Sequence, residues 1–156
     1  MSSPVQDDPP PAAAPATEPT GRLGYLLKHA QQRLAELTGP ALAPFGISGR
    51  ELAVMLTLAG CEPASQRQAA QRLGVDRTTM VALVDGLEAK NLVTRRPQEG
   101  DRRGNVVELT PHGRDTLRRA GAAAAEAERR FLAPLSPAVA AQFAGALRTL
   151  VPPPGA

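Results

Sequence analysis

Three consecutive polar residues, Arg77-Thr78-Thr79, have side chains that can recognise base pairs. A guanidinium can donate to both O6 and N7 of guanine, and a threonine can donate, accept or contact a thymine methyl group. Two further arginines, Arg102 and Arg103, lie in a stretch rich in turn-forming residues, and their planar guanidinium groups also suit phosphates. These residues predict contact with a nucleic acid, provided that the fold brings them to one surface.

Helix-capping patterns indicate the elements that would hold these residues. Ser65 begins a short helix, and Gln68, three residues on, can return a hydrogen bond to it, which is a capping box. After Gly74, Asp76 caps a second helix that extends to about Lys90. The inward stripe of this second helix consists of Met80, Val84 and Leu87. Two helices joined by a tight turn containing glycine predict a helix-turn-helix.

A β-hairpin, or wing, is expected directly after the second helix. Residues 92–96 and 105–109 are short and β-prone, and residues 97–104 between them are rich in turn formers and arginine. Arg95 and Arg96 at the base of this hairpin are candidates for phosphate contacts. Because side chains alternate along a strand, we expect one of the two to face inward.

The start of the helix that begins at Ser65 is expected to bind the DNA backbone. A helix N-terminus presents free backbone N–H groups that suit a phosphate. Ser65, Arg67 and Gln68 therefore join the candidate DNA contacts. For Ser65 and Gln68, helix capping alone remains the alternative interpretation.

Signals before this module predict two more helices. The apolar spacing of residues 21–37 is typical of an amphipathic helix. We expect Thr38-Gly39-Pro40 to interrupt it and residues 41–45 to add one more helical turn. Ser48 and Glu51 form a second capping box, which opens the next helix.

The C-terminal part predicts two helices and a dimer. Thr110-Pro111 and Ser136-Pro137 are each an N-cap followed by proline at the first helical position, and the helices extend to about Leu132 and Leu150. Both helices carry many alanines and few large apolar residues, so each buries little surface alone. We expect them to pack, together with the first helix, against the same elements of a second copy in a two-fold homodimer.

The predicted fold class is mainly α with a small β-hairpin wing, in a single domain. The expected division is a disordered Pro/Ala-rich tail (1–20), an N-terminal dimerisation helix region (21–47), a winged helix-turn-helix DNA-binding module (48–110), C-terminal dimerisation helices (111–150) and a tail (151–156). For the first tail, a dispensable leader is favoured over a functional segment.

Composition narrows the classes of function. The net charge of +3 permits nucleic-acid binding without demonstrating it. No apolar run approaches the ~20 residues of a membrane span, and the N-terminus lacks the pattern of a signal peptide. The single cysteine, Cys61, fits a reducing compartment, so a cytoplasmic protein is expected. We find no metal-ligand cluster, nucleophile motif or phosphate loop, which argues against an enzyme and against a cofactor.

Several motifs resemble those of the MarR family of bacterial transcription regulators over roughly residues 21–150. They are Val75-Asp76-Arg77-Thr78-Thr79, Leu83-Val84-Asp85, Leu87-Glu88, Asn91-Leu92-Val93, Asp101-Arg102-Arg103, and Leu109-Thr110 followed by Gly113. The resemblance implies a dimer, usually a repressor, that binds double-stranded DNA at an inverted repeat. It also implies that Asp101 holds an arginine in place so that the wing tip enters the minor groove. Val81 and Ala82 depart from the polar or basic residues frequent in the family, so thymine methyl contacts and DNA shape are expected to carry more of the specificity.

The resemblance further implies a small, often aromatic or phenolic, effector between the dimer helices and the winged module. By position, Tyr25, His29 and Met55 would line such a pocket. For Tyr25 and His29, simple packing at the dimer interface is the alternative. Some relatives sense oxidants through a cysteine, but Glu62 beside Cys61 disfavours the thiolate, so an inert thiol is expected.

A winged helix that serves only as a protein-interaction scaffold is the alternative function. The arginine-rich wing and the start of the recognition helix argue against it, because a protein-binding surface exposes more apolar area. Salt-dependent affinity for DNA would distinguish the two functions.

Overall fold

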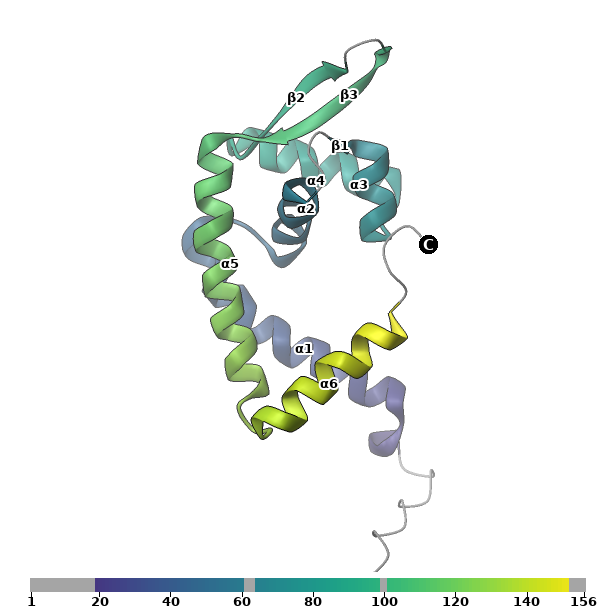
Figure 1. Cartoon of the computed structure of the whole chain (residues 1–156), viewed down its shortest axis with the longest axis vertical. Helices are drawn as coiled ribbons and strands as arrows, with labels where there is room; N and C mark the ends of the chain where they lie inside the picture. Colours follow the sequence, from purple (N-terminus) through teal and green to yellow (C-terminus); the bar gives the residue numbers. More distant parts are fainter. Residues whose placement is uncertain (1–18, 61–63, 99–100, 152–156) are drawn as a thin grey trace, which may run out of the picture. The chain divides into compact units, whose positions relative to one another are not determined.

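The computed structural model of the protein describes residues 19–60, 64–98 and 101–151, which form six α-helices and a small antiparallel sheet (Figure 1). The helices are α1 Leu23–Leu42, α2 Gly49–Ala59, α3 Gln66–Leu73, α4 Arg77–Ala89, α5 Pro111–Leu132 and α6 Pro137–Leu150. The strands are β1 Ala64–Ser65, β2 Val93–Gln98 and β3 Asp101–Leu109, and short 3₁₀ turns cover Pro19–Gly21 and Ala43–Phe45. The chain divides into two compact units, Met1–Arg33 and Leu34–Ala156. The predicted class, mainly α with a hairpin wing, is confirmed.

The caps that the sequence predicts are those at which helices begin. In five helices the cap side chain accepts a hydrogen bond from the backbone N–H three residues further along, and the cap residues are Ser48, Ser65, Asp76, Thr110 and Ser136. Both predicted capping boxes are complete. The turn after α3 is made by Gly74, whose φ of 64° lies in the left-handed region that glycine adopts without steric cost.

The predicted interruption of the first helix at Thr38-Gly39-Pro40 is wrong, because α1 continues through Pro40 to Leu42. Proline removes one N–H donor and crowds the preceding turn, but only two helical residues follow Pro40, so the cost is confined to the last turn. The hydroxyl of Thr38 also donates to the Leu34 carbonyl at 3.0 Å, which adds a bond in this turn. The expected extra turn is present as the 3₁₀ turn, which ends at Gly46 with φ 66°.

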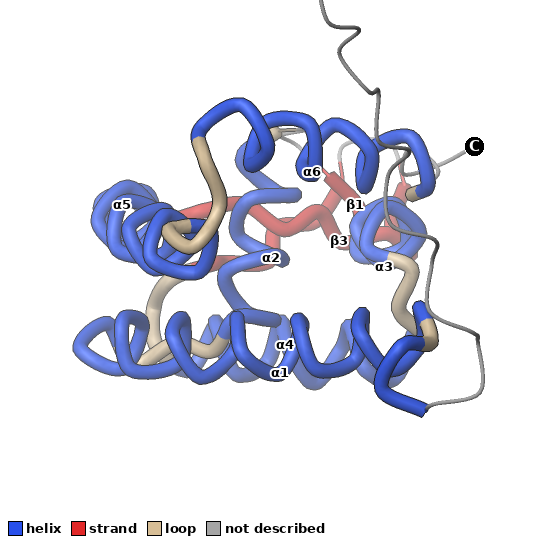
Figure 2. Tube along the Cα trace, turned by 90° about the horizontal axis from the view of Figure 1, so that it is seen from below, coloured by secondary structure: helices blue, strands red, loops and turns tan. Residues whose placement is uncertain are grey.

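The core of the second unit is built around α2, which lies between α5 and α3 (Figure 2) and also contacts α4 and β3. The predicted inward stripe of α4 is confirmed, since its residues are at most 1% exposed: Met80, Val84 and Leu87. These residues join a cluster with Met55 and Leu58 of α2 and Val93 and Val107 of the sheet. Helix α4 is therefore held by apolar packing along its inner face.

The sheet has the strand order β1-β3-β2, with β3 antiparallel to both neighbours. The wing predicted from the sequence is confirmed as the β2–β3 hairpin, in which Val93 pairs with Leu109 and Arg95 with Val107. The strand β1 was missed, because two residues are too few to give a β pattern. Its pairing of Ser65 with Val106 joins the start of α3 to the wing.

Candidate nucleic-acid interface

The N-terminus of α3 is held by a complete capping box. Ser65 Oγ accepts from the N–H of Gln68 at 3.2 Å, and the Ser65 N–H donates to Gln68 Oε1 at 3.1 Å. These two bonds confirm that Ser65 and Gln68 cap the helix. Their second predicted role, contact with a DNA phosphate, stays a prediction.

The three candidate base-contacting residues in the first turn of α4 differ in exposure and in hydrogen bonding. Arg77 and Thr78 are exposed, whereas Thr79 is partly buried. The Thr79 hydroxyl donates to Asp76 Oδ2 at 2.6 Å, and its N–H donates to Asp76 Oδ1 at 2.9 Å. These two bonds hold the pKa of the Asp76 carboxyl below its usual value. Because its proton is used at the cap, Thr79 can only accept a hydrogen bond from a ligand in this conformation.

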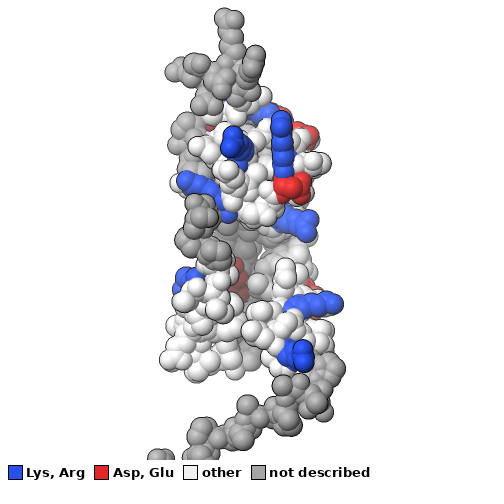
Figure 3. All heavy atoms as spheres, turned by 90° about the vertical axis from the view of Figure 1, so that its right-hand side faces the viewer, with Lys and Arg blue, Asp and Glu red and all other residues white. Residues whose placement is uncertain are grey.

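A cleft of about 350 Å³ brings three of the candidates together. Ser65 and Arg67 from the start of α3 face Arg77 from the start of α4 across it. The residues that sequence reasoning missed are Gln66, Met80 and Asn105, and the apolar Val81 completes the lining. Figure 3, which views the side of the molecule on which α3 lies, shows basic side chains more prominently than acidic ones.

Gln66 is the missed residue with the clearest polar signal. Its Nε2 atom is buried and has no hydrogen-bond partner among the described atoms. A buried amide donor without a partner is unfavourable by about 1–3 kcal/mol, so a ligand in the cleft that offered an acceptor would gain from it. Its place directly after the Ser65 cap was the only sequence signal for it.

The two arginines at the wing base face opposite ways, as the alternation along a strand predicts. Arg95 is only 21% exposed, and its guanidinium pairs with Asp85 and Glu88 of α4. Arg96 is 68% exposed, and its Nε atom lies 3.3 Å from Oε2 of Glu108 in β3. Burial opposes ionisation of Arg95, but the hydrogen bonds that Arg95 donates to Asp85 and Glu88 outweigh it and raise the Arg95 pKa.

The wing tip carries the remaining candidates. The backbone of Asp101, Arg102 and Arg103 belongs to β3. Their side chains lie outside the described residues, as do the side chain of Gln98 and the whole of residues 99–100. The DNA contacts of Arg102 and Arg103 and the shaping role of Asp101 therefore stay predictions.

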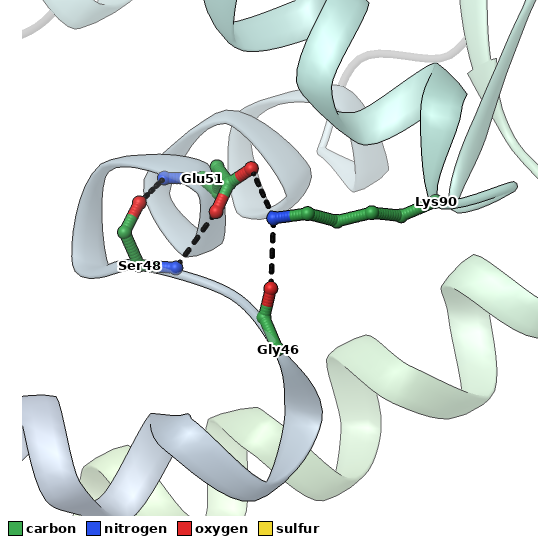
Figure 4. A network of polar contacts seen from close by, with 4 residues as sticks. All are labelled: Gly46, Ser48, Glu51 and Lys90. Carbon is green, nitrogen blue, oxygen red and sulfur yellow. Dashed lines mark hydrogen bonds and ion pairs between the residues drawn. The ribbon is translucent and has the colours of Figure 1, made fainter.

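A polar network, here called the Glu51 network, connects the far end of α4 to the start of α2 (Figure 4). Lys90 Nζ donates to Glu51 Oε1 and to the Gly46 carbonyl, both at 2.7 Å. The other oxygen of Glu51 accepts from the Ser48 N–H at 2.8 Å, so one carboxylate closes the capping box and binds the lysine. A Cβ on Gly86 would lie 3.3 Å from Glu51 Oε1, which is a tight contact. A glycine at this position therefore provides space for the Glu51 carboxylate. No local sequence pattern indicated this network.

The candidate effector residues fall in both units. In the first unit, Tyr25 and His29 stack with ring centroids 3.8 Å apart, and His29 Nδ1 donates to the Tyr25 carbonyl at 2.8 Å. In the second unit, Met55 is fully buried in the apolar core. A ligand role for these three residues stays a prediction. Cys61 lies outside the described residues.

The described part of the chain has neither a metal-binding cluster nor a single helix suited to span a membrane. Within residues 19–60, 64–98 and 101–151, no three His, Cys, Asp or Glu side chains are grouped so that they could hold a metal ion. In the same ranges no single helix has the length and hydropathy of a membrane span, although α1 with its 3₁₀ turn and α2 pass that test when taken together.

Comparisons with a family model, with curated proteins and with solved structures all indicate the same family. A model of the MarR family matches residues 45–104. The transcriptional repressor NicR of Pseudomonas putida is 31% identical over 94 residues, and the match covers 60% of this chain and 60% of NicR. The chain thus spans about three fifths of the length of this curated relative.

Solved structures extend the similarity over most of the chain. A MarR-family regulator from Rhodococcus sp. RHA1 has a TM-score of 0.80 and 26% identity, covering 86% of this chain and 96% of that one. The repressor CouR, bound to a 23-mer DNA duplex, has a TM-score of 0.80 and 32% identity, covering 84% of this chain and 93% of CouR. CouR from Rhodococcus jostii RHA1 has also been solved with p-coumaroyl-CoA. This shared architecture and similarity in sequence show that the chain belongs to the MarR family of transcriptional regulators.

Proposed function

We propose that the protein is a dimeric, sequence-specific DNA-binding transcription regulator. In this proposal it represses by occupying an inverted-repeat operator, and a small ligand releases it. The observation that carries the proposal is the cleft in which Arg67 and Arg77 converge beside the first turns of α3 and α4. A cytoplasmic location follows from the DNA partner, and no catalytic step is proposed.

The start of α4 is the proposed reader of the major groove, which admits one helix. Arg77 and Thr78 are exposed there, so a guanine contact is assigned to Arg77 and a phosphate or base contact to Thr78. Val81 is 38% exposed and lines the same cleft, where it suits a thymine methyl group. Arg67 and the N–H groups of α3 supply the adjacent phosphate contacts.

The wing is the proposed second contact. Arg102 and Arg103 in the hairpin tip are assigned to the minor groove, whose negative potential attracts guanidinium groups. Arg96, exposed at the base, is the better phosphate candidate of the two basal arginines. Arg96 is 68% exposed and Glu108 31% exposed, so water screens the pair, which can separate when a phosphate approaches.

The proposed dimer follows from the apolar surface of α6. None of its residues is buried, and large apolar side chains are exposed at Leu135 just before it, at Val139 within it and at Leu150 at its end. Large apolar side chains exposed along one helix favour an interface with another molecule. A two-fold dimer would place two winged modules on half-sites about 34–36 Å apart, one helical turn of DNA.

The proposed effector is a small aromatic or phenolic molecule. Support comes from CouR, which has been solved with p-coumaroyl-CoA, and from the exposed Tyr25–His29 pair, whose stacked rings offer a flat aromatic surface. A panel of aromatic acids and their CoA thioesters, added to the operator complex, tests this part. A compound that releases the DNA from the wild type at lower concentration than from a Tyr25→Ala variant would support the assignment. Equal release from both proteins would remove Tyr25 from the site.

The first experiment is selection of binding sites from a random DNA pool, followed by titration of the selected site across salt concentrations. We expect an inverted repeat and a steep fall of affinity with salt, because each phosphate contact releases counterions. Recovery of no enriched sequence, with weak binding throughout, would contradict the proposal and favour a protein-interaction scaffold.

The second experiment separates DNA contacts from folding. Arg102→Ala and Arg103→Ala are expected to weaken operator binding about tenfold or more at fixed salt while the dimer persists. Arg148→Ala, at an exposed arginine in the last turn of α6, is the matched control and should leave affinity unchanged. Unchanged affinity in both wing variants would remove the wing from the interface.

A further inference from the structure

The environment of Arg95 does not resemble a phosphate site. Arg95 lies in β2, which is an edge strand because the sheet order is β1-β3-β2. Its backbone N–H therefore has no strand partner on the outer side and donates to Glu88 Oε1 at 3.2 Å. Its guanidinium donates to the other oxygen of Glu88 and to Asp85 Oδ1. One residue of the wing thus uses both main chain and side chain to bind α4.

The two carboxylates are arranged to receive a guanidinium. Asp85 and Glu88 are three residues apart on α4, so they lie on one face, one turn apart. The rigid fork of an arginine can bind two carboxylates at once, which a lysine, with its single ammonium group, does less well. Arg95 is only 21% exposed, and such partly buried, charge-assisted bonds are stronger than those of surface pairs. We call these three residues the Arg95 cluster.

The charges around Arg95 oppose a phosphate contact by this residue. Two carboxylates face one guanidinium group there, which gives the group of three a net charge of −1: Asp85 and Glu88 against Arg95. Negative charge near a DNA-facing helix weakens association through electrostatic repulsion. Carboxylates at this place therefore call for a structural purpose that outweighs the repulsion.

We propose that Arg95 is a positioning residue, which fixes the wing against the recognition helix through Asp85 and Glu88 and does not itself contact DNA. The inference rests on the proposed DNA-binding function. Two contacts on one duplex reinforce each other most when their spacing is fixed, because the second contact then forms with little further loss of conformational entropy. The cluster supplies that fixed spacing between the first turn of α4 and the hairpin tip.

The decisive test is the sign of a charge change. Asp85→Asn/Glu88→Gln removes two negative charges from the DNA-facing side, so simple electrostatics predicts tighter binding. Our proposal predicts the opposite, a loss of about fivefold or more in affinity for the selected operator, with a similar loss in Arg95→Gln. The triple variant should be no worse than either, because all three changes disrupt the same cluster.

The salt dependence gives a second discriminating result. A phosphate contact contributes about one unit to the slope of log affinity against log salt. We expect Arg95→Gln to keep the wild-type slope and Arg67→Ala, at an assigned phosphate contact, to lower it by about one. Tighter binding by the carboxylate variant, additive losses in the triple variant, or a reduced slope in Arg95→Gln would each overturn the proposal.

A measurement without DNA keeps this inference separate from the proposed function. Spin labels on Thr78→Cys and Pro97→Cys, in a Cys61→Ser background, report the distance between the start of α4 and the wing. The distance distribution should broaden in Arg95→Gln and stay narrow in Arg96→Gln, the control. An unchanged distribution in Arg95→Gln would overturn the positioning role even if the wild type bound no DNA. Failure of the wild type to bind DNA, with a broadened distribution in Arg95→Gln, would instead contradict the proposed function alone.

Discussion

Helices α4 and α6 are similar in length, with 13 and 14 residues, yet the chain covers them very differently. Three apolar residues of α4 are buried almost completely, whereas α6 has no buried residue. Val139 and Leu150 of α6 are 46% and 74% exposed. The difference indicates that α4 obtains its packing from the same chain, while α6 carries exposed apolar side chains that the described residues of its chain do not fully cover.

The largest expected effect is at the junction of the winged module with α5. Gly113 is buried, and a Cβ there would overlap the Leu92 carbonyl oxygen and lie 2.9 Å from its carbon. Since backbone atoms cannot rotate away, Gly113→Ala should lower the free energy of unfolding by about 3 kcal/mol or more. Thermal unfolding at fixed protein concentration measures this.

The matched control for that variant lies in α6. A Cβ on Gly145 meets nothing within 4 Å, so Gly145→Ala should be neutral or stabilise by up to about 1 kcal/mol through helix propensity. If Gly145→Ala were the more damaging of the two, the contrast between module and α6 would be wrong.

The next prediction compares the loss of unfolding free energy when an apolar residue of α4 or of α6 is truncated. Met80→Ala in α4 removes a side chain that is 1% exposed and should cost about 2–5 kcal/mol of unfolding free energy. Val139→Ala in α6 should cost under about 1 kcal/mol in the dilute, monomeric protein, because little apolar area is removed from water there. Urea titrations of both variants, with equal slopes, test the comparison; equal losses would contradict it.

A smaller effect concerns assembly. Val139→Asp introduces a charge into the exposed surface of α6 and should raise the dimer dissociation constant at least tenfold, about 1.4 kcal/mol. The winged module should keep its fold, since Val139 belongs to no part of the buried core. Sedimentation at several concentrations gives the dissociation constant, and circular dichroism gives the fold. An unchanged dissociation constant would exclude this side of α6 from the interface.

The smallest expected effect is that of the Glu51 network. Burial opposes ionisation of Glu51, but hydrogen bonds from Lys90 and Ser48 outweigh it and lower its pKa below the ordinary 4.5. A carboxyl whose pKa is lowered by folding stabilises the protein above its unfolded pKa, and this contribution disappears as the pH falls through the folded pKa.

Glu51→Gln should therefore cost about 1 kcal/mol at neutral pH, and the difference from wild type should shrink below about pH 4. Unfolding titrations at several pH values measure it. The exposed Glu128→Gln of α5 is the control and should show no such difference. A cost for Glu51→Gln that did not change with pH would show that the ionised carboxylate is not the stabilising form.

Part of the interface could be predicted from local pattern. Ser65 and Asp76 were identified as caps, because a cap and the N–H group that it binds lie three residues apart in the chain. The alternation of Arg95 and Arg96 was predicted for the same kind of reason. Which of the two faces inward was not, since that depends on Asp85 and Glu88 being brought against β2 by the packing of α4.

The helix starts, the inward stripe of α4 and the presence of a wing follow from the sequence, because these features depend on residues close together in the chain. Three features depend on tertiary packing: the continuation of α1 through Pro40, the pairing of Ser65 with Val106, and the contacts of Lys90 with Glu51 and Gly46. The last contacts join residues 39 and 44 positions apart. Such contacts arise from how apolar faces pack, and the packing depends on the whole chain at once.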